Sequence, residues 1–179
     1  MTVARQERKP ARFRAFVTVL AGARVLATLW AAGFATIPGR AAERVVITNE
    51  WVVTNRYTGL AINGFDPVAY FVEAEPKEGR AEFEFRSNGA IWRFLNEGNR
   101  AAFAAAPDVY APRFGGYDPM ALARGAATPG HPALWLIAQQ RLYLFYSAEA
   151  RAAFAVDPAA AIDTAERNWP AIQSGLVRD

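Results

Sequence analysis

The chain has 179 residues, of which 53% are apolar and 21% are charged, so it can bury the core of one ordinary domain and is not a disordered chain. Its net charge of +3 averages a basic start, with seven Lys/Arg against one acidic residue over residues 1–42, and a body with 13 basic and 16 acidic residues. Such a body offers no basic stripe to nucleic acid, and the absence of cysteine excludes disulfides, thiol catalysis and cysteine-based zinc or iron–sulfur sites.

The first predicted element is an apolar helix over residues 15–37, which carries a single charge, Arg24. A helix of this length spans about 34 Å, enough to cross a bilayer core of about 30 Å. Alternatively, residues 25–37 are the apolar region of a cleaved signal peptide, and Gly39 and Ala41 supply the small residues of its cleavage site. Both alternatives place the body across the membrane, whereas a third, a buried helix of a soluble protein, does not.

Residues 1–42 are thus expected to be a signal peptide or an N-terminal membrane anchor, and residues 43–58 a lead-in segment. The sequence GFDPVAY then occupies residues 64–70, and GYDPMAL repeats its pattern at residues 116–122. Further matches downstream of both copies indicate an internal duplication of about 50 residues. Because two copies are too few for a solenoid, we expect one domain with pseudo-twofold symmetry.

The Asp-Pro pair in each copy is typical of a helix start. Asp66 and Asp118 are the expected N-caps, and Pro67 and Pro119 the first helical residues. The alternative is that the symmetry axis brings the two carboxylates face to face, where they would share a proton or a cation.

An alternating apolar pattern follows in each copy and predicts an antiparallel β-hairpin. Asn88 and Gly89 are a strong turn signal in the first hairpin, and Gln139 and Gln140 a weaker one in the second. The aromatic residues that recur in both hairpins are expected in the core: Trp92, Phe94, Tyr143 and Phe145.

Each hairpin leads into an alanine-rich helix, over residues 96–106 and 147–156, that ends at the following proline. Asn96 and Ser147 are the expected N-caps, and Phe103 and Phe154 the matching core residues. A last helix over residues 159–169 is expected to end at the Trp169-Pro170 pair, with residues 173–179 as a tail. The predicted fold class is α+β: a small single domain over residues 59–172, built from two pseudo-symmetric units over residues 64–114 and 116–160.

His131 is the only histidine of the sequence and stands between proline residues in TPGHPALW. A metal site that includes it would need carboxylates for its other ligands and would suit a hard or borderline ion. The candidate metal ligands are therefore Asp66, Asp118 and His131, and the alternative for His131 is a solvent-facing loop residue.

Four aromatic residues lie outside the register of the repeat: Trp51, Tyr57, Trp135 and Trp169. They are the candidates for an interaction surface or a ligand pocket, and packing at the edge of the core is the alternative. No set of residues in the sequence suggests a catalytic site.

Five segments between residues 51 and 172 resemble the YHS-domain family, in its secreted bacterial branch: GLAINGFDPVAYF, NGAIWRF, NRAAFAAAPDVYAPRFGGY, RLYLFYS and NWP. The resemblance implies a small module that is not an established enzyme, related to cysteine-bearing modules thought to bind heavy metals. Members of this branch often carry a cysteine just after Gly-Gly-Tyr, where this chain has Asp118, so a thiolate metal site does not transfer.

These observations predict a non-enzymatic module, exported or tethered on the periplasmic side of the inner membrane. We expect it to bind a partner protein or to be an accessory subunit of a membrane complex, with residues 15–37 in the membrane if they are not cleaved. No cofactor and no nucleic acid are expected. The alternative is a small domain that binds a divalent metal through Asp66 and Asp118.

Overall fold

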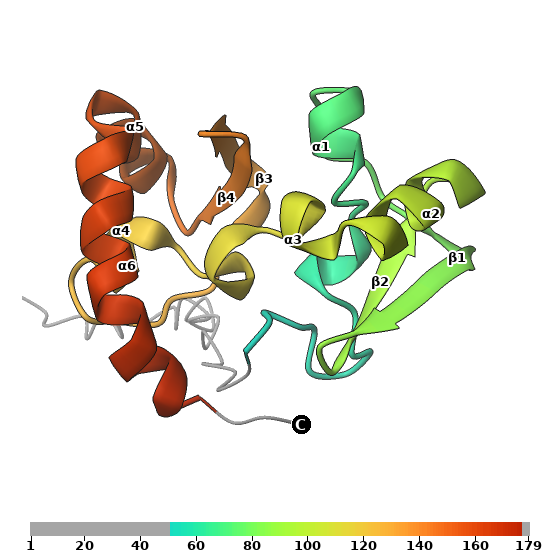
Figure 1. Cartoon of the computed structure of the whole chain (residues 1–179), viewed down its shortest axis with the longest axis horizontal. Coiled ribbons are helices and arrows are strands. Elements are labelled where there is room, and N and C mark those ends of the chain that lie inside the picture. The colour runs from blue at the N-terminus through green and yellow to red at the C-terminus, as the bar shows by residue number, and fades with distance from the viewer. Residues whose placement is uncertain (1–50, 177–179) are drawn as a thin grey trace, which may run out of the picture. The chain divides into compact units, whose positions relative to one another are not determined.

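The computed structural model describes residues 51–176, which combine short helices with two separate two-stranded antiparallel sheets (Figure 1). The prediction of a mixed helix and strand fold is thereby confirmed. The predicted signal or anchor, including residues 15–37, lies outside the described residues. Between residues 51 and 176, no helix combines the length and the apolar character that crossing a bilayer requires.

The helices and strands follow the same order twice along the chain. The first set is η1 (Ile62–Gly64), α1 (Ala69–Val72), β1 (Arg80–Ser87), β2 (Ala90–Phe94), α2 (Glu97–Ala105) and α3 (Pro107–Tyr110). The second set is η2 (Arg113–Gly116), α4 (Pro119–Leu122), β3 (His131–Ala138), β4 (Arg141–Phe145), α5 (Ala148–Val156) and α6 (Pro158–Ser174). We refer to these sets as the first and second units.

The two hairpins share their turn geometry and their irregularities. Both central residues of each turn have positive φ, at 51° and 76° for Asn88 and Gly89 and at 48° and 58° for Gln139 and Gln140. This is the backbone that a two-residue hairpin turn requires. The β1–β2 and β3–β4 ladders each shift register near their open end. Both predicted turns are therefore confirmed, although the glutamines adopt a conformation that glycine or asparagine would adopt more easily.

The alanine-rich helices begin at their predicted caps. The Asn96 side chain accepts a hydrogen bond from the Asn99 N–H at 2.9 Å, and the Ser147 hydroxyl accepts one from the Ala150 N–H at 3.2 Å. The prolines after these helices start the next helix as well as ending the previous one, because proline fits the first helical position, where no N–H is needed.

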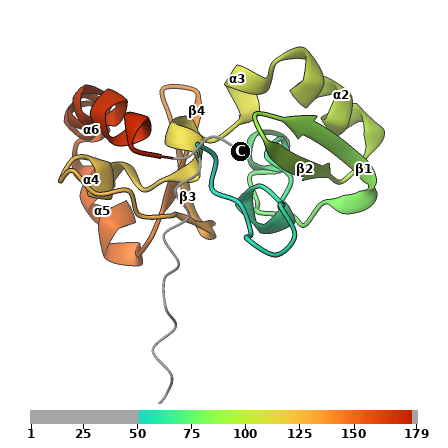
Figure 2. The ribbon, with the colours of Figure 1, turned by 90° about the horizontal axis from the view of Figure 1, so that it is seen from below.

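The prediction that the last helix ends at Trp169-Pro170 is wrong, because α6 continues through Pro170 to Ser174. Proline inside a helix costs about 3 kcal/mol. Here Trp169 packs edge-on against Phe114, and Ile172, one turn further, packs against the same core. This tertiary packing keeps the chain helical beyond the proline. Figure 2 shows α4, α5 and α6 gathered on the side of the β3–β4 hairpin.

Strand β4 contributes to two hydrophobic cores. Its residues alternate between them, as the two faces of a strand require. Leu142 and Leu144 are buried in the core of the first unit, whereas Tyr143 and Phe145 are buried in the core of the second. The core positions predicted from the repeat, including Phe103 and Phe154, are buried, and β4 packs the two units together.

The lead-in segment also joins the two units. The Val53 N–H donates to the Gly115 carbonyl at 2.8 Å, and the Val53 carbonyl accepts from the Ile62 N–H at 3.1 Å. Gly115 has a φ of +63°, and a Cβ atom there would lie 1.9 Å from the carbonyl oxygen of Trp51. Only glycine therefore lets the lead-in segment approach η2 this closely.

Candidate functional site

Asp66 is a fully buried carboxylate with four hydrogen-bond donors around it. Its Oδ1 accepts from the N–H groups of Val68 and Ala69 at the start of α1, at 2.8 and 3.3 Å. Its Oδ2 accepts from the Leu95 N–H at 2.8 Å and from the Asn99 Nδ2 at 2.7 Å. The carboxylate thus joins the start of a helix to the end of β2 and to α2.

Asp118 repeats this arrangement in the second unit. Its Oδ1 accepts from the Met120 and Ala121 N–H groups at 2.7 and 3.4 Å, and its Oδ2 accepts from the Tyr146 N–H at 3.0 Å. The second unit has no counterpart of the Asn99 side-chain amide, because Ala150 occupies the equivalent position.

The predicted helix starts are correct for α4, where Asp118 is the N-cap and Pro119 the first residue. For α1 the prediction is wrong by two residues, since the helix begins at Ala69. Despite this difference, Asp66 accepts hydrogen bonds from the equivalent N–H groups. Each aspartate satisfies donors of its own unit, and the two share no hydrogen-bond partner among residues 51–176.

His131 begins β3 and is exposed. Its Nδ1 accepts a hydrogen bond from the Ala133 N–H at 3.1 Å, within the same strand. Within residues 51–176, no group of three or more His, Asp or Glu side chains is placed to hold a metal ion. The carboxylates of Asp66 and Asp118 are surrounded by N–H donors, which suit a carboxylate acceptor and do not suit a cation.

A pocket of about 240 Å³ lies between the two units and is lined by aromatic and charged side chains. We call it the inter-unit pocket. Its aromatic walls come from Trp51 of the lead-in segment, Trp92 of β2 and Trp169 of α6, and Phe114 adds to them. Residues more than a hundred positions apart in the sequence therefore meet there. The polar members of the lining are Asn88, Asp108, Arg113, Arg141 and Gln173.

The two arginines of the inter-unit pocket have different partners. Arg113 forms an ion pair with Glu166 of α6, and its guanidinium lies 5.4 Å from the centre of the Phe114 ring. Arg141 donates to the backbone carbonyl of Asp108. Burial raises the pKa of the nearby Tyr143 hydroxyl, and the two guanidinium groups oppose that shift.

The structure places the four candidate aromatics in three different settings. Trp51 and Trp169 line the inter-unit pocket. Trp135 packs edge-on against Tyr70, with ring centres 5.3 Å apart, and is partly buried beside the core of the first unit. Tyr57 is exposed in a turn, with the Arg56 guanidinium over its ring.

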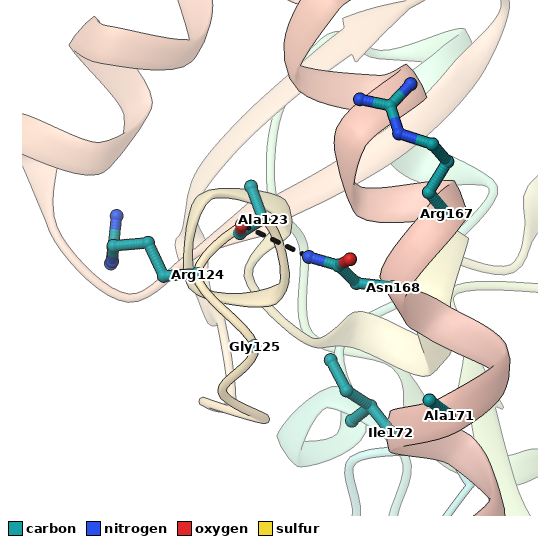
Figure 3. A pocket seen from close by; sticks show the side chains of 7 residues that line it. All are labelled: Ala123, Arg124, Gly125, Arg167, Asn168, Ala171 and Ile172. Atoms are coloured by element: carbon teal, nitrogen blue, oxygen red, sulfur yellow. Dashed lines mark hydrogen bonds between the residues drawn. The ribbon is translucent and has the colours of Figure 1, made fainter.

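A second depression lies between α6 and the segment after α4 and is broad and open to solvent (Figure 3). Asn168 donates to the Ala123 carbonyl within it, and Arg167 forms an ion pair with Asp163. Its two arginines, Arg124 and Arg167, lie on opposite sides of it in Figure 3, and no aromatic side chain lines it. The inter-unit pocket is therefore the better candidate for a binding site, because it combines aromatic walls with polar groups.

Sequence reasoning missed the polar residues of the inter-unit pocket, although the repeat contains a signal for two of them. Arg141 occupies the hairpin position that Ala90 has in the first unit, as the ladders show. Arg113 likewise stands where the repeat has Ala61. Both alanines are buried, so the arginines are departures from the repeat rather than parts of it.

Comparisons of this chain with protein-family models, with curated proteins and with solved structures found no match. A function for the chain has to be argued from the geometry and chemistry of its own residues.

Proposed function

We propose that this chain is a non-enzymatic binding module, similar to YHS-domain proteins, that holds a segment of a partner protein in the inter-unit pocket. The pocket that Trp51 and Trp169 share carries this proposal. Aromatic side chains and arginine dominate the binding energy of protein interfaces, and they do so in pockets that exclude water. The inter-unit pocket has both residue types in its lining.

The size of the inter-unit pocket supports a protein partner over a cofactor. Sites for small molecules and cofactors measure about 300–1,000 Å³. The volume of about 240 Å³ is smaller than this range and suits one anchoring side chain of a larger partner. In this proposal Asp66 and Asp118 are structural, and the module functions without a resident metal.

The two units descend, in this proposal, from one duplicated ancestor. The recurrence of the element order, of the buried aspartate and of the hairpin register supports this origin. The pocket then arose where the copies diverged, at Arg113 and Arg141. The basic and apolar N-terminal sequence supports an export signal or an anchor, which would place the module on the periplasmic side of the inner membrane, as an accessory subunit of a complex there.

Site-specific photo-crosslinking in intact cells tests the proposal. A photoreactive phenylalanine replaces Gln173 at the pocket or, as the control, Val156, which is 86% exposed on α5. We expect an adduct of one defined mass from position 173 and none of that mass from position 156. Equal adducts from both positions, or no adduct from position 173, would contradict the proposal.

A further inference from the structure

The two arginines that line the inter-unit pocket differ in how their charge is compensated. The guanidinium of Arg113 is neutralised by the carboxylate of Glu166. Within residues 51–176, the guanidinium of Arg141 donates only to a backbone carbonyl and forms no ion pair with a carboxylate. A guanidinium has five N–H donors in a planar fork that matches a carboxylate. Arg141 therefore offers donors at the pocket to an acidic group from outside the chain.

The aromatic part of the lining limits the shape of the group that enters. Trp51 and Trp169, which are half-buried, give the pocket an apolar aromatic lining, whereas Trp92 in the same lining is almost fully buried. Aromatic rings pack on such a lining edge-on or offset, and gain about 0.5–1.5 kcal/mol beyond burial of their area. Because Arg113 is paired with Glu166, the charged side chains of the lining that have no ion pair within residues 51–176 are Arg141 and Asp108, and of these the guanidinium of Arg141 attracts an acidic group.

From these two observations, and resting on the proposed function, we propose that the partner presents an aromatic side chain directly next to an aspartate or glutamate. The aromatic ring enters between Trp51 and Trp169, and the carboxylate binds the guanidinium of Arg141. Arg113, in its ion pair with Glu166, belongs to the same lining.

Short capped peptides and fluorine NMR of the full chain test this specificity. The chain has five tryptophans, so 5-fluorotryptophan labelling gives a small set of signals that single Trp→Phe variants assign. Trp51, Trp92 and Trp169 report on the inter-unit pocket, whereas Trp135 packs elsewhere, against Tyr70, and is an internal control. The probes are Ac-Phe-Glu-NH₂, the neutral Ac-Phe-Gln-NH₂ and Ac-Ala-Glu-NH₂, which lacks the ring.

We expect Ac-Phe-Glu-NH₂ to shift the Trp51 and Trp169 signals in a saturable way and to leave Trp135 unmoved. Because the ion pair with Arg141 is partly exposed, Ac-Phe-Gln-NH₂ should bind about three- to tenfold more weakly. Ac-Ala-Glu-NH₂ should not saturate. The variant Arg141→Gln should bind both phenylalanine peptides equally, whereas Arg124→Gln, a change at an exposed arginine of the other depression, should keep the preference.

Equal affinity of the chain for Ac-Phe-Glu-NH₂ and Ac-Phe-Gln-NH₂ would overturn this inference, as would a preference that survives in Arg141→Gln. Absence of any shift at Trp51 and Trp169 would overturn it as well. If the adduct from position 173 nevertheless forms, the inference fails and the proposed function stands. If neither binding nor adduct is found, both fail.

Discussion

At the scale of single residues, Asp66 and Asp118 each accept hydrogen bonds from backbone N–H groups that the helices and strands of the same unit leave without a partner. A buried carboxylate is costly unless donors surround it, and here backbone N–H groups of a helix start and of a strand end supply them. The two sites differ by a single donor, the side-chain amide of Asn99. This difference allows the contribution of each set of hydrogen bonds to the free energy of unfolding to be measured.

We predict that Asp66→Ala lowers the free energy of unfolding by about 3–5 kcal/mol, because it leaves buried donors unpaired. Asn99→Ala gives Asp66 the donor set of Asp118 and should cost only about 1 kcal/mol. Urea unfolding of the full chain, followed by circular dichroism, measures both values. A smaller loss for Asp66→Ala than for Asn99→Ala would contradict a structural role for the carboxylate.

Tyr70 joins the units through a buried hydroxyl that donates to the Pro132 carbonyl at 2.9 Å. Burial, and to a lesser degree the charge of Asp66, raises its pKa above the ordinary value. Because the pKa of Tyr70 is raised in the folded state, the contribution of its neutral hydroxyl to the free energy of unfolding is fully present below the pKa of tyrosine in the unfolded chain, about 10. It is lost as the pH rises above that value.

Stability should therefore fall more steeply above about pH 10 in the natural chain than in Tyr70→Phe, which has no phenol at this position. Below that pH, Tyr70→Phe should be less stable by about 1 kcal/mol, because the Pro132 carbonyl loses its donor. Thermal unfolding across a pH series tests both. A parallel decline of the two proteins at high pH would show that Tyr70 does not titrate with unfolding.

At the scale of elements, much of the arrangement could be predicted because local signals and the repeat agree. Asn88-Gly89 specified its turn by composition, and Asn96 and Ser147 specified their helix starts. The continuation of α6 through Pro170 could not be predicted, since it depends on the packing of Trp169 against Phe114. Tertiary packing of this kind has no local sequence signal.

Gly115 illustrates the same limit, because its need for glycine comes from the lead-in segment and not from its own neighbours. We predict that Gly115→Ala is markedly destabilising, since it combines a strained φ with a clash at the Trp51 carbonyl. Gly125→Ala is the matched control: its φ is +81°, but nothing lies within 4 Å of the added Cβ atom. It should cost only about 1–2 kcal/mol.

Chemical unfolding of the two glycine variants measures the difference, and the fluorine signal of Trp51 should shift in Gly115→Ala alone. An equal loss of stability in both variants would mean that the close approach of the lead-in segment does not matter.

At the scale of the whole molecule, the inter-unit pocket depends on the way in which two similar units pack against each other. Strand β4 supplies side chains to both cores, and the lead-in segment bonds to both units. The sequence pointed to Trp51 and Trp169 because they lie outside the repeat, but their meeting depends on this packing. Trp135 satisfied the same criterion and instead packs against Tyr70.

Binding of a partner protein at the inter-unit pocket can be tested by measuring the yield of the adduct from position 173 in two further variants. Trp51→Ala removes one wall of the pocket, whereas Tyr57→Ala removes an aromatic residue of the same segment that is 85% exposed. We expect the adduct to be lost in Trp51→Ala and kept in Tyr57→Ala, with the two variants equally folded by circular dichroism. An adduct of undiminished yield in Trp51→Ala would contradict binding at this pocket.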